Sequence, residues 1–184
     1  MQWRNSSSRY GLVSMWLHWG IALVVFGLFG LGLWMVELDY YSGWYRTAPD
    51  LHKSIGLSLF ALMLLRLLWR WLSPPPLTLP SYGKLTRLGA ALGHGLLYVG
   101  LFALMLSGYL ISTADGRGIG LFGLFEVPAS ITSIPDQEDL AGAVHFYLAW
   151  GLVIFAGLHG LAALKHHFID RDATLTRMLG RSAD

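Results

Sequence analysis

The chain has 184 residues, of which 54% are hydrophobic and only 13% are charged, and its formal net charge is +2. This composition excludes an ordinary soluble domain and indicates a membrane protein. The chain has no cysteine, which excludes disulfides, iron–sulfur ligation and a covalently attached haem. The basic residues flank apolar stretches, so membrane topology explains them better than a nucleic-acid partner does.

The first apolar stretch runs from Leu12 to Val36 without a charged residue. Twenty-five residues are enough to cross the hydrocarbon core of a bilayer as a helix. A cleaved secretory signal has a shorter apolar core and a small-residue cleavage site, so we expect a retained transmembrane helix over about residues 12–36. This helix carries His18 near its start. Gly32, fourteen residues later, leaves a gap on the same face for a porphyrin edge or for ordinary helix packing.

The second apolar stretch, about residues 51–72, is interrupted by Lys53, Arg66 and Arg70. Lysine and arginine near the ends of a helix can extend to the membrane surface, so we expect this stretch to span the membrane as well. His52 stands at its start, and Arg66, fourteen residues later, falls on the same helical face. Arg66 is interpreted either as a topological anchor or as a partner for a haem propionate or a quinone carbonyl.

A proline-rich connection at residues 73–80 ends the second helix and leads into the third apolar stretch. This stretch predicts a third transmembrane helix over about residues 88–114. His94 and Tyr98 lie about one helical turn apart in its first half.

A longer, partly apolar loop at residues 115–139 follows, and we expect it to fold back as a lid over whatever the helices hold. The fourth predicted transmembrane helix covers about residues 140–165. A polar tail at residues 166–184 completes the chain. Its first two residues, His166 and His167, are expected to face water or lipid headgroups.

Charge sets the predicted orientation, because cytoplasmic loops are rich in Lys and Arg. With both termini inside, ten of the thirteen Lys and Arg face the cytoplasm: Arg4, Arg9, Arg66, Arg70, Lys84, Arg87, Lys165, Arg171, Arg177 and Arg181. The other three, Arg46, Lys53 and Arg117, face outward. We therefore predict an all-α membrane protein in which residues 1–184 form one domain, a bundle of four transmembrane helices with both termini in the cytoplasm and the longer loop outside.

His145 and His159 stand fourteen residues apart in the fourth predicted helix, which is otherwise apolar around them. Fourteen residues are close to four helical turns, so the two imidazoles share one face about 21 Å apart along the helix axis. Coordinating groups at these two levels of a membrane indicate a helix that carries two haems. The alternative is that both histidines bond to neighbouring backbone or hydroxyl groups, although imidazoles within a membrane are costly and usually functional.

The other buried histidines fall at the same two levels. His18, His94 and His159 are predicted to lie roughly 10 Å deep on the cytoplasmic side, whereas His52 and His145 lie near the opposite surface. Two levels with at least a pair of imidazoles each favour two bis-histidine haems over two metal ions, because zinc requires three or four ligands and the buried segments supply no carboxylate. Without cysteine, such haems are b-type haems held without covalent links.

Six short motifs carry a resemblance to a known family. They are SMWLHW around His18, LHKSIG at His52, the SPPP connection, GHGLLY at His94, YLISTADG after the third helix, and the H-x13-H helix that ends in ALKHHFID. In order and spacing, they resemble the bacterial cytochrome b561 family over nearly the whole chain. The resemblance implies a multi-pass protein of the bacterial inner membrane that holds two haem b and exchanges electrons with ubiquinone.

The resemblance also implies which histidines bind the haem iron. Ligands in this family come from the first, second and fourth helices. His18 and His159 would then hold the cytoplasmic-side haem, and His52 and His145 the periplasmic-side haem. His94 is left beside the inner haem as a hydrogen-bonding partner of a propionate or quinone, or as a proton relay. A structural role for His94 and an exchange of ligand place with His18 are the alternatives.

Quinone chemistry requires proton donors and hydrogen-bond donors near a haem. The cytoplasmic-side candidates for contacts with the quinone or with a propionate are Arg66, Lys84, Arg87, His94 and Tyr98. On the periplasmic side, Lys53 beside His52 is a candidate contact that would draw a small anion to the outer haem.

Some proteins that this chain resembles are superoxide oxidases, which pass an electron from periplasmic superoxide to ubiquinone, so a quinone-linked oxidoreductase of this kind is one expectation. The outer loops are acidic overall, which opposes attraction of superoxide. An alternative is a conduit between the quinone pool and a periplasmic redox protein that docks on residues 115–139. A hypothesis of a different class is a non-redox membrane transporter or assembly anchor whose histidines carry protons or bind a metal.

Overall fold

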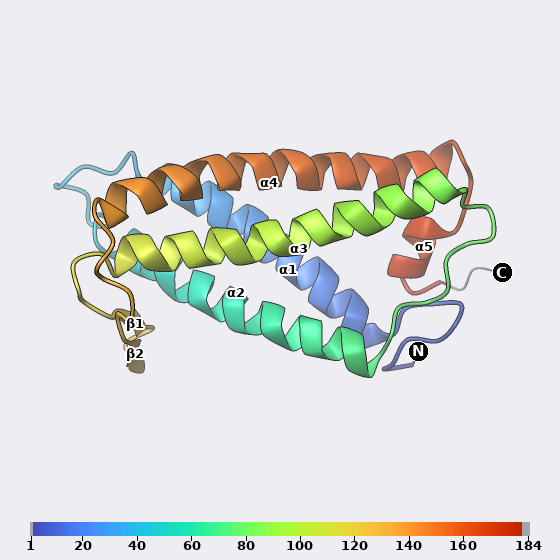
Figure 1. Ribbon diagram of the computed structural model, residues 1–184, viewed down its shortest axis with the longest axis horizontal. Helices are drawn as coiled ribbons and strands as arrows, with labels where there is room; N and C mark the ends of the chain where they lie inside the picture. Colours follow the sequence, from blue (N-terminus) through green and yellow to red (C-terminus); the bar gives the residue numbers. More distant parts are fainter. Residues whose placement is uncertain (1, 182–184) are drawn as a thin grey trace. The chain divides into compact units, whose positions relative to one another are not determined.

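The computed structural model describes residues 2–181, and its helices and strands are labelled in Figure 1. Four long α-helices account for most of it: α1 (Leu12–Met35), α2 (Thr47–Leu72), α3 (Lys84–Ser112) and α4 (Gln137–Phe168). Each of them is long and apolar enough to cross a membrane. The predicted all-α membrane fold with four spanning helices is therefore confirmed.

Three of the long helices extend beyond the apolar stretches that predicted them. Helix α2 and helix α3 each begin four residues earlier than expected, and α4 is three residues longer at each end. The added first turns contain acidic residues, Asp50 in α2 and Glu138 and Asp139 in α4, which the helix dipole favours at an N-terminus. Hydropathy marks the part of a helix that lies in lipid and misses the polar turns that continue it.

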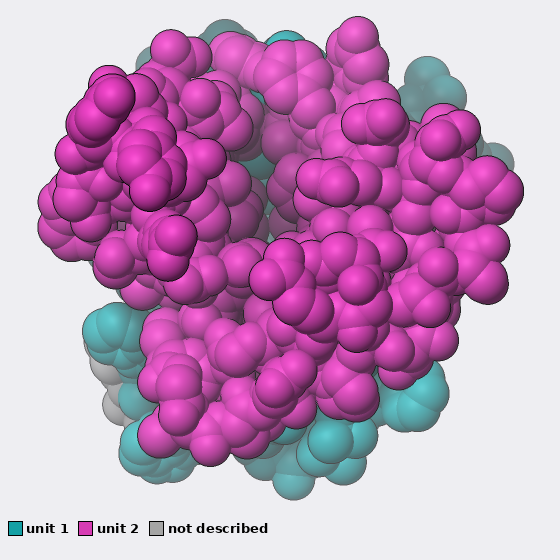
Figure 2. All heavy atoms as spheres, turned by 90° about the vertical axis from the view of Figure 1, so that its left-hand side faces the viewer, with its two compact units in different colours: residues 1–22, 62–98, 154–184 teal, residues 23–61, 99–153 magenta. Residues whose placement is uncertain are grey.

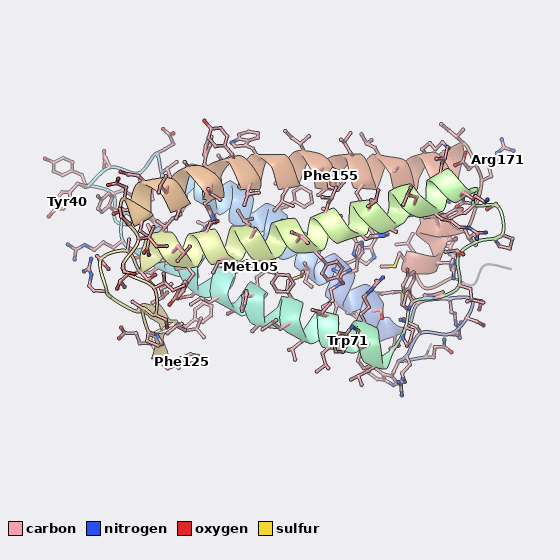
Figure 3. The ribbon with its side chains drawn as sticks, viewed as in Figure 1. Tyr40, Trp71, Met105, Phe125, Phe155 and Arg171 are labelled. Carbon is pink, nitrogen blue, oxygen red and sulfur yellow. The ribbon has the colours of Figure 1, made fainter. Side chains whose placement is uncertain are left out.

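Most large apolar side chains of the helices are exposed on the protein surface rather than buried in a core. In the most apolar window of each long helix, only 6–11% of the residues are buried. Trp71 in the last turn of α2 and Tyr40 in the connection before α2 are 78% and 73% exposed (Figure 3). Apolar surface of this extent fits contact with lipid, with aromatic rings near the helix ends at the membrane surface.

The chain forms two compact units, which are coloured separately in Figure 2. Unit 1 comprises residues 1–22, 62–98 and 154–184, and unit 2 comprises residues 23–61 and 99–153. Each long helix contributes one part to each unit. Each unit therefore has four helical segments of its own.

In unit 1, the segment after α4 turns back onto the helices and contains the short helix α5 (Thr174–Met178) (Figure 1). Trp19 Nε1 donates to Met178 O at 3.0 Å, which holds α5 against α1. Arg177 Nη2 donates to Leu77 O at 3.0 Å in the α2–α3 connection. The predicted tail is thus folded as far as residue 181, and residues 182–184 lie outside the described residues.

In unit 2, the predicted loop at residues 115–139 contains a β-hairpin that the sequence did not predict. Strand β1 (Ile119–Leu121) pairs with strand β2 (Phe125–Val127) in antiparallel fashion, with Gly120 opposite Glu126. The turn between the strands has positive φ at two consecutive residues, Phe122 (49°) and Gly123 (72°). Such a turn follows the twist of a hairpin, and a glycine adopts its conformation without steric cost.

Ser54 of α2 anchors this hairpin. Its Oγ donates to Gly120 O at 3.2 Å and accepts from Phe122 N at 3.1 Å. The Ser54 side chain is buried and follows His52 by two residues, so the hairpin lies beside the second turn of α2. Contact with a helix fits the expectation that the loop folds back, although the structure gives it strands.

Candidate functional site

Unit 2 brings together His52 of α2 and His145 of α4. Their ring centroids lie 6.3 Å apart and their planes are inclined by 71°. Both side chains are half-buried. The two imidazoles that the sequence placed at one membrane level thus face each other from different helices.

The orientation of His145 is set by α3. His145 Nδ1 lies 2.9 Å from Leu104 O and 3.1 Å from Ser107 Oγ. Ser107 Oγ itself donates to Leu104 O at 2.8 Å. Because a carbonyl can only accept, Nδ1 of His145 carries the proton, and Nε2 keeps a lone pair that can bind a metal.

His52 has no such partner. Its Nδ1 is buried and forms no hydrogen bond within residues 2–181. A buried polar atom without a partner is unusual and requires an explanation. A group that binds to the His52 ring and fixes its orientation would explain this unpartnered atom.

Two glycines make room for the two rings of unit 2. A Cβ on Gly32 of α1 would lie 3.3 Å from His52 Cε1, and a Cβ on Gly108 of α3 would lie 3.0 Å from His145 Cε1. The sequence predicted a gap at Gly32 for a porphyrin edge or helix packing. The structure places the His52 ring there, so Gly32 accommodates the imidazole itself.

Unit 1 brings together three imidazoles, from α1, α3 and α4. The ring centroids of His18 and His159 lie 6.3 Å apart with an interplanar angle of 75°. Those of His94 and His159 lie only 5.3 Å apart. His18 and His159 are half-buried, whereas His94 is exposed on the protein surface.

Arg66 of α2 joins this cluster. Its Nη2 lies 3.1 Å from His18 Nδ1, and its Cζ lies 5.5 Å from the centre of the Tyr98 ring in a cation–π contact. A guanidinium can only donate, so Nδ1 of His18 accepts this hydrogen bond and the ring proton is on Nε2. Binding of a metal through Nε2 of His18 therefore requires that this proton move to Nδ1 and that Arg66 turn its donors away. The structure therefore gathers His18, His94, Tyr98 and His159 around one basic side chain.

Three other predicted site residues do not join either cluster. Arg87 is exposed, and its Nε donates to Tyr82 O at 3.0 Å. Lys84 is exposed in the first turn of α3. Lys53 Nζ pairs with Asp50 Oδ1 at 2.9 Å. Within the described residues, no hydrogen bond or ion pair connects these side chains to an imidazole.

A separate group of charged residues lies at the C-terminal end of α4. His166 Nδ1 lies 2.9 Å from Asp170 Oδ2 and 2.8 Å from Asp172 Oδ2, and Lys165 Nζ lies 2.7 Å from the same oxygen of Asp170. Because an ammonium already pairs with Asp170, we interpret this group as an ion-pair network rather than a metal site. The side chain of His166, which was expected to face water or headgroups, is 18% exposed and pairs with these two carboxylates.

Sequence reasoning missed the residues that orient His145. The small pair Ser107–Gly108 interrupts an apolar run of the third helix, and this pattern is a usable signal for a close neighbour. Leu104 contributes its backbone carbonyl, which no side-chain pattern reveals. Ser54 was likewise missed, because a serine in an apolar helix has many uses.

The two facing pairs share one separation, 6.3 Å in both units. A histidine nitrogen binds a metal at about 2 Å and the ring centre lies roughly 1 Å further, so one ion between two imidazoles sets the ring centres about 6 Å apart. Two nitrogen ligands suit haem iron, whose other ligands are porphyrin nitrogens. They are too few for zinc. The fold and these sites define a membrane cytochrome, of the b type because the chain has no cysteine.

Comparison with known proteins gives the family. The family model described as prokaryotic cytochrome b561 matches residues 9–181. The chain belongs to this family, which confirms the resemblance carried by the six motifs. It is therefore a multi-pass bacterial membrane protein of electron transfer, and its family implies haem b as the cofactor.

Three relatives cover nearly the whole chain. "Cytochrome b561 homolog 2" of Escherichia coli (strain K12) is 56% identical over 183 residues, which is 100% of this chain and 97% of the relative. "Probable superoxide oxidase CybB" of Yersinia pestis is 30% identical over 172 residues, covering 93% and 96%. "Cytochrome b561 homolog 1" of Escherichia coli (strain K12) is 27% identical over 179 residues, covering 95% and 98%.

Proposed function

We propose that this protein is a di-haem electron-transfer protein that connects a periplasmic electron donor to the ubiquinone pool. The observation that carries the proposal is the pair of facing imidazoles in each unit, with the same 6.3 Å separation. Bound haem supplies reversible one-electron chemistry, and the protein supplies ligands, orientation and electrostatics.

His52 and His145 are proposed as the ligands in unit 2, and His18 and His159 as the ligands in unit 1. The 5.3 Å between the His94 and His159 rings is shorter than the roughly 6 Å that one ion between two imidazoles requires. This distance supports a role for His94 beside the haem rather than on its iron.

Unit 1 is proposed to face the cytoplasm and unit 2 the periplasm of the bacterial inner membrane. Both termini then lie inside, as the distribution of Lys and Arg favours. The hairpin β1–β2 and the longer α3–α4 connection lie outside in this orientation.

Ubiquinone is proposed to bind at unit 1, where donors gather. Arg66 is proposed to hold a quinone carbonyl, which is supported by its guanidinium donating to His18 Nδ1 and lying beside Tyr98. His94 is exposed on the apolar surface, so a lipid-soluble quinone reaches it from the membrane, and with Tyr98 it supplies protons. Lys84 and Arg87, in the first turn of α3, are proposed to connect this site to the cytoplasm. The protein then acts as a quinone-linked oxidoreductase.

Superoxide is the proposed donor at unit 2. The name of the Yersinia pestis relative supports it, and Lys53 adjoins His52 in the chain. The pairing of Lys53 with Asp50 weakens the attraction of an anion. A docked periplasmic redox protein is the second candidate, favoured by the exposed apolar tip of the hairpin, where Leu124 is 80% and Phe125 59% exposed.

The test is a reduced-minus-oxidised absorption spectrum of the purified protein with haem quantified per chain. We expect two low-spin b haems in the wild type, one in His145→Ala and two in His94→Ala. Equal haem loss in the two variants would overturn the ligand assignment. A colourless wild-type protein would overturn the redox proposal and favour a non-redox transporter or assembly anchor.

A further inference from the structure

The two imidazole pairs differ in what faces the Nδ1 atom of one of their rings. In unit 2, Nδ1 of His145 donates to the carbonyl of Leu104. In unit 1, Nδ1 of His18 faces the guanidinium of Arg66 at 3.1 Å. The first neighbour is a neutral acceptor, and the second is a permanent positive charge.

The charged side chains near the imidazoles also differ between unit 1 and unit 2. In unit 1, Arg66 lies between His18 and Tyr98, and Arg70 follows it by about one turn of α2. In unit 2, Lys53 follows His52 in the chain, and its Nζ pairs with Asp50 Oδ1 at 2.9 Å. Unit 1 thus has a guanidinium directly beside an imidazole, whereas the charges next to His52 in unit 2 form an ion pair with each other.

These surroundings favour different redox states. A carbonyl that accepts a hydrogen bond from the ring N–H makes the imidazole a more basic ligand, which stabilises the more positive, oxidised iron. A positive charge beside the ring destabilises the oxidised iron and favours the reduced one, and the half-buried setting weakens solvent screening of this effect. Both effects act to place the midpoint potential of the haem held in unit 1 above that of the haem held in unit 2.

Tyr98 keeps the charge in place. The guanidinium of Arg66 stacks over its ring with Cζ 5.5 Å from the centroid, and this contact does not depend on which nitrogen of His18 carries a proton. The charge therefore stays beside His18 even when Nδ1 is protonated and Arg66 turns its donors elsewhere.

We propose that Arg66 raises the midpoint potential of the haem held in unit 1 above that of the haem held in unit 2. This inference rests on the proposed function. A one-electron donor at unit 2 would then be oxidised by one electron, and the haem held in unit 1 would be reduced by that electron. Arg66 is in this respect a positioning residue that sets the direction of electron transfer toward the quinone side.

The test is a spectroelectrochemical titration of the purified, haem-loaded protein. Wild type is expected to show two reductive steps, and His52→Ala, which lacks the unit 2 haem, is expected to keep the higher step. Arg66→Met is expected to shift the higher step to lower potential and leave the lower step in place. Arg66→Lys, which keeps the charge, is expected to restore most of the wild-type value. Arg171→Gln, a change to an exposed arginine, is the control and is expected to move neither step.

Three results would overturn the inference: an unmoved higher step in Arg66→Met, an upward shift, or an equal shift in Arg66→Lys. If Arg66→Met does not retain haem in unit 1, Arg70→Gln replaces it, with a smaller downward shift expected and an unmoved step overturning the inference. Haem content is measured on the same samples. Fewer than two haems in the wild type would mean that the proposed function fails, whereas two haems with an unmoved step would overturn only the role of Arg66.

Discussion

Units 1 and 2 hold imidazole pairs of equal separation in unequal surroundings. In unit 2, the rings are fixed by neutral groups: a carbonyl, a serine, and two glycines that leave room for them. In unit 1, a guanidinium and a third imidazole stand beside the pair. The equal separation suits the same kind of cofactor in both units, whereas the unequal neighbours give the two sites different electrostatic surroundings.

Replacing His159 with alanine is the change that most strongly tests this comparison. His159 faces both His18 and His94, so its loss removes the common partner of unit 1. The haem content of His159→Ala is expected to fall from two to one per chain, measured by pyridine haemochrome assay. His167→Ala, eight residues further along the chain, is the control and is expected to keep two haems. Retention of both haems by His159→Ala would remove unit 1 from the haem-binding proposal.

A smaller expected effect concerns the rigidity of unit 2. In Gly108→Ala, the new Cβ would meet His145 Cε1 at 3.0 Å, and such overpacking typically costs about 1–3 kcal/mol. We expect a lower thermal midpoint and faster haem loss from unit 2. Gly95→Ala on the same helix meets nothing within 4 Å and is expected to be neutral or up to about 1 kcal/mol stabilising. Equal behaviour of the two variants would contradict the tight fit around His145.

The anchor of the hairpin offers a third test. Ser54→Ala removes the hydrogen bonds to Gly120 O and Phe122 N, each worth about 0.5–1.5 kcal/mol. Hydrogen exchange at residues 119–127 is expected to accelerate. The matched control is Ser58→Ala, because Ser58 Oγ donates only to the carbonyl of Ser54 in its own helix. Unchanged exchange in Ser54→Ala would show that other contacts hold the hairpin.

The smallest expected effect is a pH-dependent loosening of the C-terminal segment of unit 1. Burial acts to raise the pKa of Asp172, but hydrogen bonds from Thr174 and His166 outweigh it, so the pKa lies below its ordinary value. The Asp172 carboxylate therefore stabilises the folded segment above the ordinary pKa of about 3.9, and this contribution is lost as pH falls through the lowered pKa.

The C-terminal segment is thus expected to loosen below about pH 4 and to remain docked near neutral pH. The fluorescence of Trp19, taken as wild type minus Trp19→Phe, reports the change because Trp19 is bonded to Met178 O. In Asp172→Asn, the acid transition is expected to be absent. A transition of the same size in that variant would assign it to other groups.

The helices and the histidine levels could be predicted from the sequence because both depend on short-range regularities. Uninterrupted apolar runs give the spans, and a spacing of fourteen residues gives a shared face. The pairing of His52 with His145 and of His18 with His159 was predicted by depth and family resemblance together, and both pairs are close in the structure.

The surroundings of the pairs could not be predicted, because they depend on contacts between residues far apart in the chain. The contact of Arg66 with His18 joins residues 48 positions apart, and that of Ser107 with His145 joins residues 38 apart. The hairpin was missed for a related reason. Its strands have only three residues each, and they are stabilised by a serine of another helix.

The Ser54 anchor separates two tasks that evolution or design can then change independently. Hydrogen bonds from one side chain to the backbone of Gly120 and Phe122 set the base of the hairpin, while the side chains of Phe122, Leu124 and Phe125 are exposed and take no part in them. Substitution of these exposed side chains can therefore change what the hairpin contacts without removing its anchor. The imidazoles and the glycines that fit around them need not change.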